Sequence, residues 1–294
     1  LKNLRKDLIV FNKLMNHFKL FCLCLDSHHL QNIKYLNYIP VGLGQNKFSK
    51  EWLTDDKGEN ISAKNPFYGE YSFHYWLWKN RLSELQDNEW LGFCGYRYHW
   101  GQQSKKKSDE LNKIVNKNNF KDLILRKIPD EWSGYEVILG DEMSVNNYKL
   151  SKILKHAKLK FLMNPKLLFK KNRNIKLHFD IFHGEGYLEK AIRLLDKKDQ
   201  EGFEEFVMTK TSFNRENMFF CRSKKLLGEY YQCIFRWLSK CEDVFGFNLD
   251  GYSKKRIYAF LAERFVSYWF QKNSNYVNWP IFFYDTNANR LTLK

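Results

Sequence analysis

The run FKLFCLCL, residues 18–25, is the segment that decides the fold. It is short and apolar along almost its whole length, and the polar residues 26–29 (DSHH) follow it. Such a run predicts a buried strand that ends in a polar loop. When a strand of this kind opens a wound α/β sheet, the loop after it lies at the carboxyl edge, where nucleotides bind. We therefore expect His28 to contact a ligand, although an ordinary surface-loop histidine is the simpler interpretation.

Strands and helices alternate on both sides of this run. Further strands are expected at 38–43, in the middle of 89–100, at 135–139 and from Asn217 onward. Helices are expected within 69–85, 187–195, 201–207 and 225–242, and a last helix, capped by Ser253, has an apolar stripe that starts at Ile257. The alternation predicts an α/β fold with one mixed sheet flanked by helices.

The length and composition favour a single globular domain. The chain has 294 residues, 44% of them apolar, which is enough to fill a substantial core. We expect the domain to cover residues 17–294. Residues 1–16 are basic and amphipathic and predict a helical extension, consistent with a linker from a longer chain. The six cysteines form no CxxC pair, so reduced core residues are expected.

The net charge of +16 predicts a positive surface, which favours phosphates, anionic lipid or nucleic acid as partners. Abundant lysine, asparagine, phenylalanine and tyrosine are also typical of an AT-rich genome, so part of the charge has a compositional explanation. No segment approaches the roughly 20 apolar residues that span a bilayer. We expect a cytoplasmic protein, with peripheral contact to an anionic membrane at the inner face.

Common catalytic signatures are absent from the sequence. It contains no GxSxG elbow, no GxxxxGK[ST] phosphate loop, no GxGxxG fingerprint and no HExxH zinc helix. The remaining candidates are polar residues at strand ends and within aromatic helices.

Two neighbouring segments carry a family resemblance. The first, 55–80 (DDKGENISAKNPFYGEYSFHYWLWKN), has Asp56, Asn60 and Asn65 before an aromatic helix that contains Glu70; the second is WLGFCGYRYHW, 90–100. Together they resemble a family of bacterial capsule and exopolysaccharide glycosyltransferases long catalogued as a domain of unknown function. The Asn-Met-Phe segment at 217–219 and the helix with Arg256, Leu261, Glu263 and Arg264 extend the resemblance to nearly the whole chain.

The resemblance implies a GT-A-like, Rossmann-like fold and transfer of a sugar from a UDP-sugar to a hydroxyl of an oligosaccharide or lipid-linked glycan acceptor. Some members are associated with galactofuranose transfer, so a furanose of the galactose or N-acetylgalactosamine type, transferred with inversion, is expected. The chain departs from the family at Gly95, Tyr96, Arg97 and Tyr98, where the family has His-Tyr-Arg-Arg. Donor preference is therefore open.

Several residues are expected to bind the donor. Arg97 follows a buried strand, where a guanidinium could pair with the diphosphate, and a structural salt bridge is the alternative. Asp56, Asn60 and Asn65 suit ribose, uracil or sugar hydroxyls, and turn stabilisation is their alternative. The resemblance adds five more residues: Glu70, Tyr96, Asn217, Arg256 and Arg264. The buried Arg264 needs a partner, expected to be Glu70, Asp180 or the diphosphate.

The general base must be a carboxylate or histidine beside the acceptor. His183 and Glu185, in the HGEG loop 183–186, are the first candidates, followed by Asp180 and Glu263. No Asp-x-Asp motif follows the strand before Arg97. A divalent ion such as Mn²⁺ or Mg²⁺ is therefore not expected to be essential, and the acidic pairs Asp55–Asp56 and Asp141–Glu142 are the alternative places for a metal site.

Two other classes fit part of the sequence. The charge and interleaved aromatics would suit a nucleic-acid-binding protein, but no RNP-type, zinc or helix-turn-helix motif supports it, so no nucleic-acid partner is expected. A non-catalytic carbohydrate-binding module would need only exposed aromatics.

Overall fold

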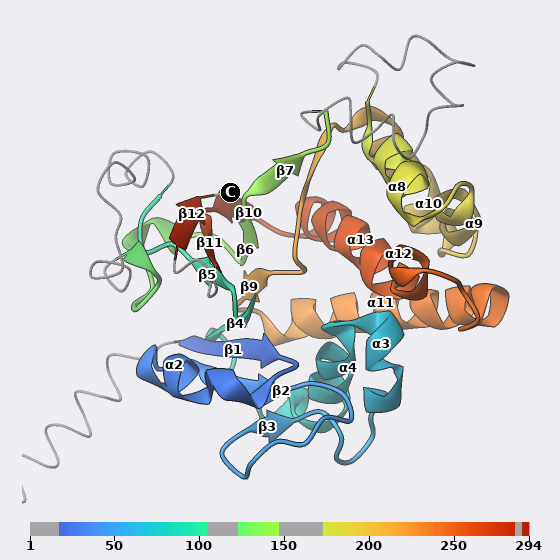
Figure 1. The fold of residues 1–294 in the computed structure, drawn as a ribbon. Coiled ribbons are helices and arrows are strands. Elements are labelled where there is room, and N and C mark those ends of the chain that lie inside the picture. The colour runs from blue at the N-terminus through green and yellow to red at the C-terminus, as the bar shows by residue number, and fades with distance from the viewer. Residues whose placement is uncertain (1–17, 105–122, 147–172, 286–289, 294) are drawn as a thin grey trace, which may run out of the picture.

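The structure is a computed structural model that describes residues 18–104, 123–146, 173–285 and 290–293. The extension predicted for residues 1–16 lies outside the described residues. Figure 1 shows strands and helices in alternation around one central sheet, so the α/β prediction is confirmed.

Among the described residues, seven strands form the central sheet in the order β10-β6-β9-β4-β1-β2-β3. All neighbouring pairs are parallel except those of β9, which runs antiparallel to β4 and β6. The sheet is mixed, as predicted. Its strands are β1 Phe18–Cys24, β2 Ile39–Gly42, β3 Leu53–Thr54, β4 Trp90–Gly95, β6 Val137–Gly140, β9 Phe219–Cys221 and β10 Tyr276–Trp279.

Strand β1 is apolar on both sides because both faces of the sheet are covered. Successive side chains of a strand point to opposite faces. Phe21 and Leu23 accordingly join one hydrophobic cluster, while Leu20 and Cys22 join a second cluster on the other face. Helices α4, α11 and α13 contribute to the first cluster and α2 to the second. A strand buried on both faces cannot show the polar alternation of a sheet with one solvated face.

Helices fill the layers on either side of the sheet. The longest, α11 and α13, pack against each other, and α11 also packs against α4. The helices are α2 Leu30–Tyr35, α3 Asn65–Tyr68, α4 Tyr71–Asn80, α8 Ile175–His183, α9 Tyr187–Ile192, α10 Lys197–Thr209, α11 Lys224–Phe245, α12 Tyr252–Lys255 and α13 Ile257–Asn273, with short 3₁₀ turns η1 Ser27–His29, η2 Ser62–Lys64, η3 Leu82–Glu84 and η5 Asp130–Trp132.

Two small sheets flank the central one. In the described residues, one has the order β12-β11-β5 and the other pairs β7 with β8. Their strands are β5 Tyr98–Trp100, β11 Ile281–Asp285, β12 Arg290–Leu293, β7 Glu142–Ser144 and β8 Ser212–Asn214.

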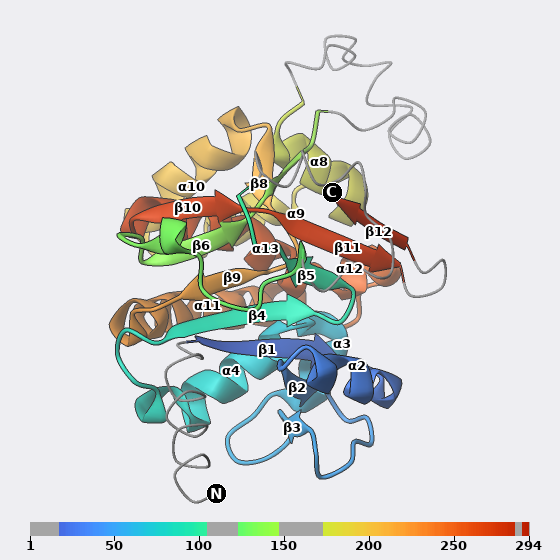
Figure 2. The same cartoon turned by 90° about the vertical axis from the view of Figure 1, so that its left-hand side faces the viewer.

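The strand order creates a switch point beside β1. From β1 the chain moves to β2 and β3 on one side and then returns to β4 on the other. Figure 2 shows β1 and β4 side by side with their carboxyl ends at the same edge of the sheet. Ligands of open α/β sheets bind at such a point, because the connections leave it in opposite directions and open a crevice.

Three local expectations were wrong. Ser253 does not cap the last helix, because it lies within α12, and Arg256 separates α12 from α13. His183 is the last residue of α8 rather than part of a loop, and the break begins at Gly184, whose φ of 109° ends the helix. Asn217 precedes its strand, because its left-handed backbone, with a φ of 52°, delays β9 to Phe219.

Candidate functional site

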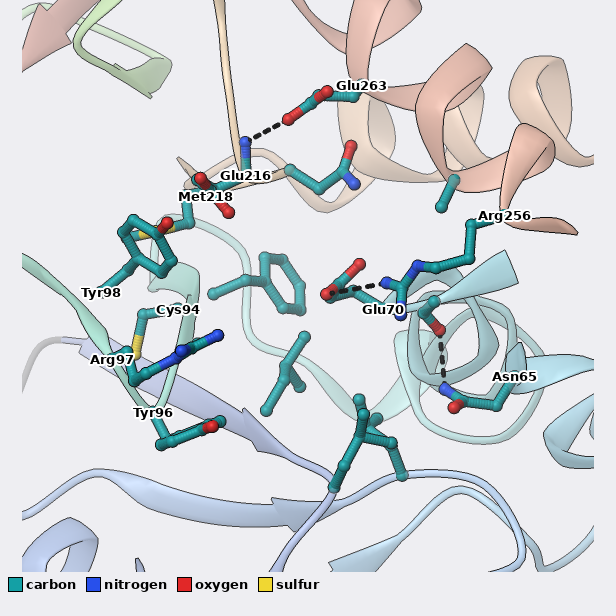
Figure 3. A pocket seen from close by; sticks show the side chains of 18 of the residues that line it. Asn65, Glu70, Cys94, Tyr96, Arg97, Tyr98, Glu216, Met218, Arg256 and Glu263 are labelled. Carbon is teal, nitrogen blue, oxygen red and sulfur yellow. Dashed lines mark hydrogen bonds and ion pairs between the residues drawn. The ribbon is translucent and has the colours of Figure 1, made fainter. Parts of the chain in front are cut away.

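A cavity of about 300 Å³ opens at the switch point. Its walls come from the ends of β1 and β4, the segment before β9, the junction of α3 with α4, and the first turns of α12 and α13. Figure 3 shows the side chains that converge on it. Segments far apart in the sequence therefore build the pocket that the strand order predicts.

The turn between β4 and β5 forms one wall. Tyr96 and Arg97 occupy this turn, and the ring of Tyr96 stacks on that of His29 with centroids 4.2 Å apart. The guanidinium carbon of Arg97 lies 5.3 Å from the centre of Tyr96 and 5.8 Å from that of Phe283. Within the described parts of the chain, no carboxylate lies at ion-pair distance from Arg97. Rings thus position a charged fork that matches phosphate oxygens.

The positions that depart from the family resemblance also lie in this wall. A Cβ built on Gly95 would meet nothing closer than the ring of Tyr98, at 3.8 Å. By contrast, a Cβ on Gly92 in the same strand would come within 2.1 Å of Phe220. Gly92 is thus required by packing, whereas Gly95 leaves space at the edge of the cavity.

The segment before β9 brings a carboxylate into the pocket from the opposite wall. Glu216 and Asn217 both have left-handed backbones, with φ of 66° and 52°, which is uncommon for residues other than glycine. The amide N–H of Glu216 donates to Oε1 of Glu263 on α13 over 2.7 Å. This contact, drawn in Figure 3, holds the strained segment in place and directs Glu216 toward the cavity.

The environment of Glu216 changes its acidity. Burial raises the pKa of Glu216 to about 7, the nearby Glu263 carboxylate adds to the rise, and a hydrogen bond from the Tyr98 hydroxyl opposes it. Burial also raises the pKa of Glu263. A carboxylate that titrates near neutral pH can both accept and release a proton under physiological conditions.

Behind this wall lies the buried Arg264, only 1% exposed. Its Nη1 donates to Oε2 of Glu263 and to the carbonyl of Phe260, and its Nη2 lies 3.2 Å from His178 Nδ1 and from His183 Nε2. Among the ion pairs of the described residues, Arg264 pairs with its neighbour Glu263, which was not among the expected partners, while the expected contact with a diphosphate stays a prediction. Arg264 does not line the cavity.

The two histidines beside Arg264 are neutral. Burial lowers the pKa of both His178 and His183, and the positive charge of Arg264 lowers it further. Neutral imidazoles can accept hydrogen bonds from the guanidinium. His183 also stacks on Phe260 with centroids 3.9 Å apart. These contacts favour a structural role for His183.

The other catalytic candidates on this side are also outside the cavity. Asp180 accepts from Lys176 Nζ at 2.8 Å and from the Gly186 amide at 3.3 Å, so it connects α8 to the start of α9. Glu185 is exposed and does not line the cavity.

Hydrogen bonds between its own residues stabilise the loop at 55–65. Asn60 accepts from the amide and hydroxyl of Ser62 and donates to the carbonyls of Asp56 and Gly58. This is the turn chemistry weighed above for Asp56 and Asn60, and neither residue lines the cavity.

Asn65 lines the cavity and donates to the Gly69 carbonyl at 2.8 Å. Gly69 has a φ of 56°, and a Cβ there would lie 2.7 Å from Nη2 of Arg256. The glycine therefore lets Arg256 approach the backbone. Nη2 of Arg256 then lies 3.6 Å from Oε1 of Glu70, as Figure 3 shows.

The structure therefore divides the predicted site residues into two groups. Seven line the cavity: Asn65, Glu70, Tyr96, Arg97, Asn217, Arg256 and Glu263. Seven do not: His28, whose ring faces Asp26, and Asp56, Asn60, Asp180, His183, Glu185 and Arg264. For all fourteen, a role in binding or catalysis stays a prediction. Sequence reasoning missed Glu216, Tyr98 and Tyr252, although Glu216 directly precedes the Asn-Met-Phe segment.

Two further properties concern the part of the chain that the structure describes. It contains no group of three or more His, Cys, Asp or Glu residues arranged to hold a metal ion. Nor does any helix in it have the length and apolar character needed to cross a membrane.

Comparison with known proteins identifies a family that matches the sequence and a solved structure with a similar fold. A family described as "Domain of unknown function (DUF4422)" matches residues 19–274. Among solved structures, the chain is similar to WbbM, a bifunctional glycosyltransferase in its apo form, with a TM-score of 0.61 and 22% sequence identity. The match covers 91% of this chain and 45% of that one, so the chain spans about half its length. No curated protein matches the sequence.

Proposed function

The chain belongs to the DUF4422 family, and we propose that it is a glycosyltransferase that uses a nucleotide-sugar donor. The observation that carries the proposal is the pocket at the switch point, where Arg97 lies on one wall and Glu216, with a pKa near 7, lies on another. Glycosyl transfer needs a cation for the leaving diphosphate and a base for the acceptor hydroxyl. The similarity in fold to part of a bifunctional glycosyltransferase also supports the proposal that the chain is a glycosyltransferase.

The donor is proposed to be a UDP-sugar that lies across the ends of β1 and β4. Leu23, Leu43 and Asn65 offer apolar surface and an amide for the nucleoside, close to the end of β1. The diphosphate then lies against Arg97, which can donate two parallel hydrogen bonds to phosphate oxygens. Space beside Gly95 accommodates part of the donor that a larger side chain would exclude.

In the reaction, the acceptor oxygen attacks the anomeric carbon of the donor sugar. A new carbon–oxygen bond forms as the bond to the diphosphate breaks, and UDP leaves with that electron pair. The proton of the acceptor hydroxyl passes to the Glu216 carboxylate. Arg97 stabilises the charge that develops on the diphosphate. Direct displacement of this kind inverts the anomeric centre.

Glu216 is the proposed base because the other three carboxylates that line the pocket are engaged, Asp26 by the ring and amide of His28. Glu263 accepts from the Glu216 amide through one oxygen and from Arg264 through the other. Glu70 lies beside Arg256. Glu216 retains a carboxylate directed at the cavity, so Glu263 is assigned as a positioning residue.

The finer assignments rest on the family resemblance. The proposed sugar is a furanose of the galactose or N-acetylgalactosamine type, and the acceptor is a capsular or exopolysaccharide intermediate, free or lipid-linked. The proposed location is the cytoplasm, at the inner face of the membrane, where the net charge of +16 favours anionic lipid. Product analysis by NMR tests the sugar, and a pyranosyl linkage or a retained anomeric configuration would contradict these assignments.

A thermal-shift panel of nucleotides tests the function itself. A ligand that binds only the folded protein raises stability by about 2.7 kcal/mol at a concentration one hundred times its dissociation constant. UDP and UDP-sugars should raise the melting temperature most, GDP and CMP less, and Arg97→Gln should weaken the UDP effect. If no nucleotide shifts the wild-type protein at millimolar concentration while duplex DNA binds with a steep salt dependence, the transferase proposal fails.

A further inference from the structure

An exposed aromatic ring lies at the mouth of the pocket, on the side away from Arg97. Tyr252 is 72% exposed, the highest value among the large hydrophobic residues that the structure describes, and it also lines the cavity. Gly251 before it has a φ of 85°, and Tyr252 then begins the four-residue helix α12. A tyrosine at a cavity presents an apolar ring face together with a polar hydroxyl, a combination that is enriched at binding surfaces.

The Glu70–Arg256 pair lies next to this ring. The guanidinium carbon of Arg256 is 5.6 Å from the centre of the Tyr252 ring, and Nη2 is 3.6 Å from the Glu70 carboxylate. Nε of Arg256 is buried and has no hydrogen-bond partner within the described structure. Because both residues line the cavity, the guanidinium N–H groups other than the buried Nε and the carboxylate oxygens offer donors and acceptors beside an aromatic face.

This combination suits a sugar ring rather than a nucleotide phosphate. The apolar C–H face of a sugar can cover an aromatic ring, while its neighbouring hydroxyls can donate to a carboxylate and accept from a guanidinium. A phosphate would instead meet repulsion from Glu70, which lies between Arg256 and the centre of the cavity in Figure 3.

The position of the Tyr252 side of the cavity relative to Glu216 indicates whether it binds the donor sugar or the acceptor sugar. Figure 3 places Arg97 and Tyr96 on one side of the cavity and Glu70 and Arg256 on the other, with Glu216 above the space between them. A base must reach the attacking hydroxyl, so the attacking sugar lies across from the diphosphate. We propose that Tyr252, Glu70 and Arg256 form the acceptor subsite, which takes the terminal sugar of the glycan by stacking on Tyr252. This inference rests on the proposed function.

The test separates acceptor binding from nucleotide binding. Transfer is measured with octyl glycosides of galactose, glucose, mannose and N-acetylglucosamine as acceptors, and their binding is followed by saturation-transfer NMR in the presence of UDP. Tyr252→Ala should raise the acceptor KM about tenfold, the upper range for loss of one aromatic stacking contact. Tyr252→Trp should restore it, because the ring rather than the hydroxyl makes the contact. Tyr35→Ala, which removes a tyrosine 59% exposed on α2, is the matched control.

Calorimetry with UDP makes each outcome decisive. An increase in acceptor KM with an unchanged UDP dissociation constant supports the subsite. Unchanged acceptor KM in Tyr252→Ala, or wild-type protein that binds UDP but none of the four glycosides, overturns it. A parallel loss of UDP affinity would assign Tyr252 to the nucleotide instead. Wild-type protein that binds no UDP rejects the proposed function rather than the subsite alone.

Discussion

Replacing Tyr98 by phenylalanine should move the pH dependence of transfer, because the Tyr98 hydroxyl donates a hydrogen bond to Glu216 that lowers the pKa of this carboxyl. The ring packs on Phe283 with centroids 5.1 Å apart, and phenylalanine preserves that contact. The variant therefore removes a hydrogen bond without opening a cavity. The ionised form of Glu216 loses stabilisation, so its pKa must rise.

The size of the shift follows from the energy of one hydrogen bond. A hydrogen bond to a charged group contributes about 1.5 kcal/mol at the lower end of its range, and this lower figure is used for the partly buried Glu216. One pKa unit corresponds to about 1.4 kcal/mol, so the pKa of Glu216 should rise from about 7 to about 8. At pH 6.5 the ionised fraction then falls about eightfold, whereas above pH 9 the variant and the wild type converge.

The assay is the pH profile of kcat/KM, which reports the ionisation of the free enzyme. Initial rates of UDP release are measured between pH 5.5 and 9.5 with the donor that the panel identifies. Tyr96→Phe, in the turn just before Tyr98, is the matched control. The acid limb of its profile, where kcat/KM falls as the pH is lowered, should stay at the wild-type pH. Glu216→Gln should lower turnover about 10²- to 10⁴-fold and abolish the limb. A limb that stays at the same pH in Tyr98→Phe, or persists in Glu216→Gln, would refute the assignment of Glu216 as the base.

Three further predictions test other parts of the structure. Arg97→Lys should lower turnover about tenfold or more, because lysine keeps the charge but loses the bidentate fork, and turnover should survive EDTA; activity lost on chelation and restored by Mn²⁺, with Arg97→Lys active, would contradict this. Arg264→Met should cost about 3–5 kcal/mol in urea unfolding, because Glu263 is left buried without its cation, and the double variant Glu263→Met/Arg264→Met should recover part of the loss. The protein should co-sediment with phosphatidylglycerol vesicles and much less with phosphatidylcholine, because each basic residue near an anionic surface contributes about 1 kcal/mol; equal partition would make the charge incidental.

The strands that follow long apolar runs were predictable, whereas β3 and β10 of the central sheet were not predicted. The run 18–25 shows no polar alternation, and the structure explains this by burying β1 on both faces. The run at 90–95 has the same character, and it became β4. Such runs depend on local hydrophobicity alone, so a single sequence reveals them. Helix ends were less predictable, as Ser253 shows, because capping depends on where the chain enters the helix.

The pocket could be located from the sequence, but its carboxylate could not. The polar residues that follow the apolar runs at 18–25 and 90–95 predict a site near Arg97, and in the structure Arg97 lines the cavity. Glu216 belongs to no periodic pattern. Its orientation depends on a left-handed backbone and on a bond to Glu263, 47 residues away in the sequence. A hydrogen bond between residues far apart in the sequence follows no fixed spacing, so a single sequence cannot reveal it.

The buried Arg264 connects stability to the proposed chemistry. Burying a guanidinium is costly, and a hydrophobic residue of similar size often stabilises a protein more. Here, however, Arg264 opposes the rise in the pKa of Glu263 and so favours its ionised form, which holds the Glu216 amide. The same negative charge raises the pKa of Glu216 toward neutrality. Retaining the arginine therefore sets both the direction and the acidity of the proposed base, which explains why a charged residue lies on the apolar stripe of α13.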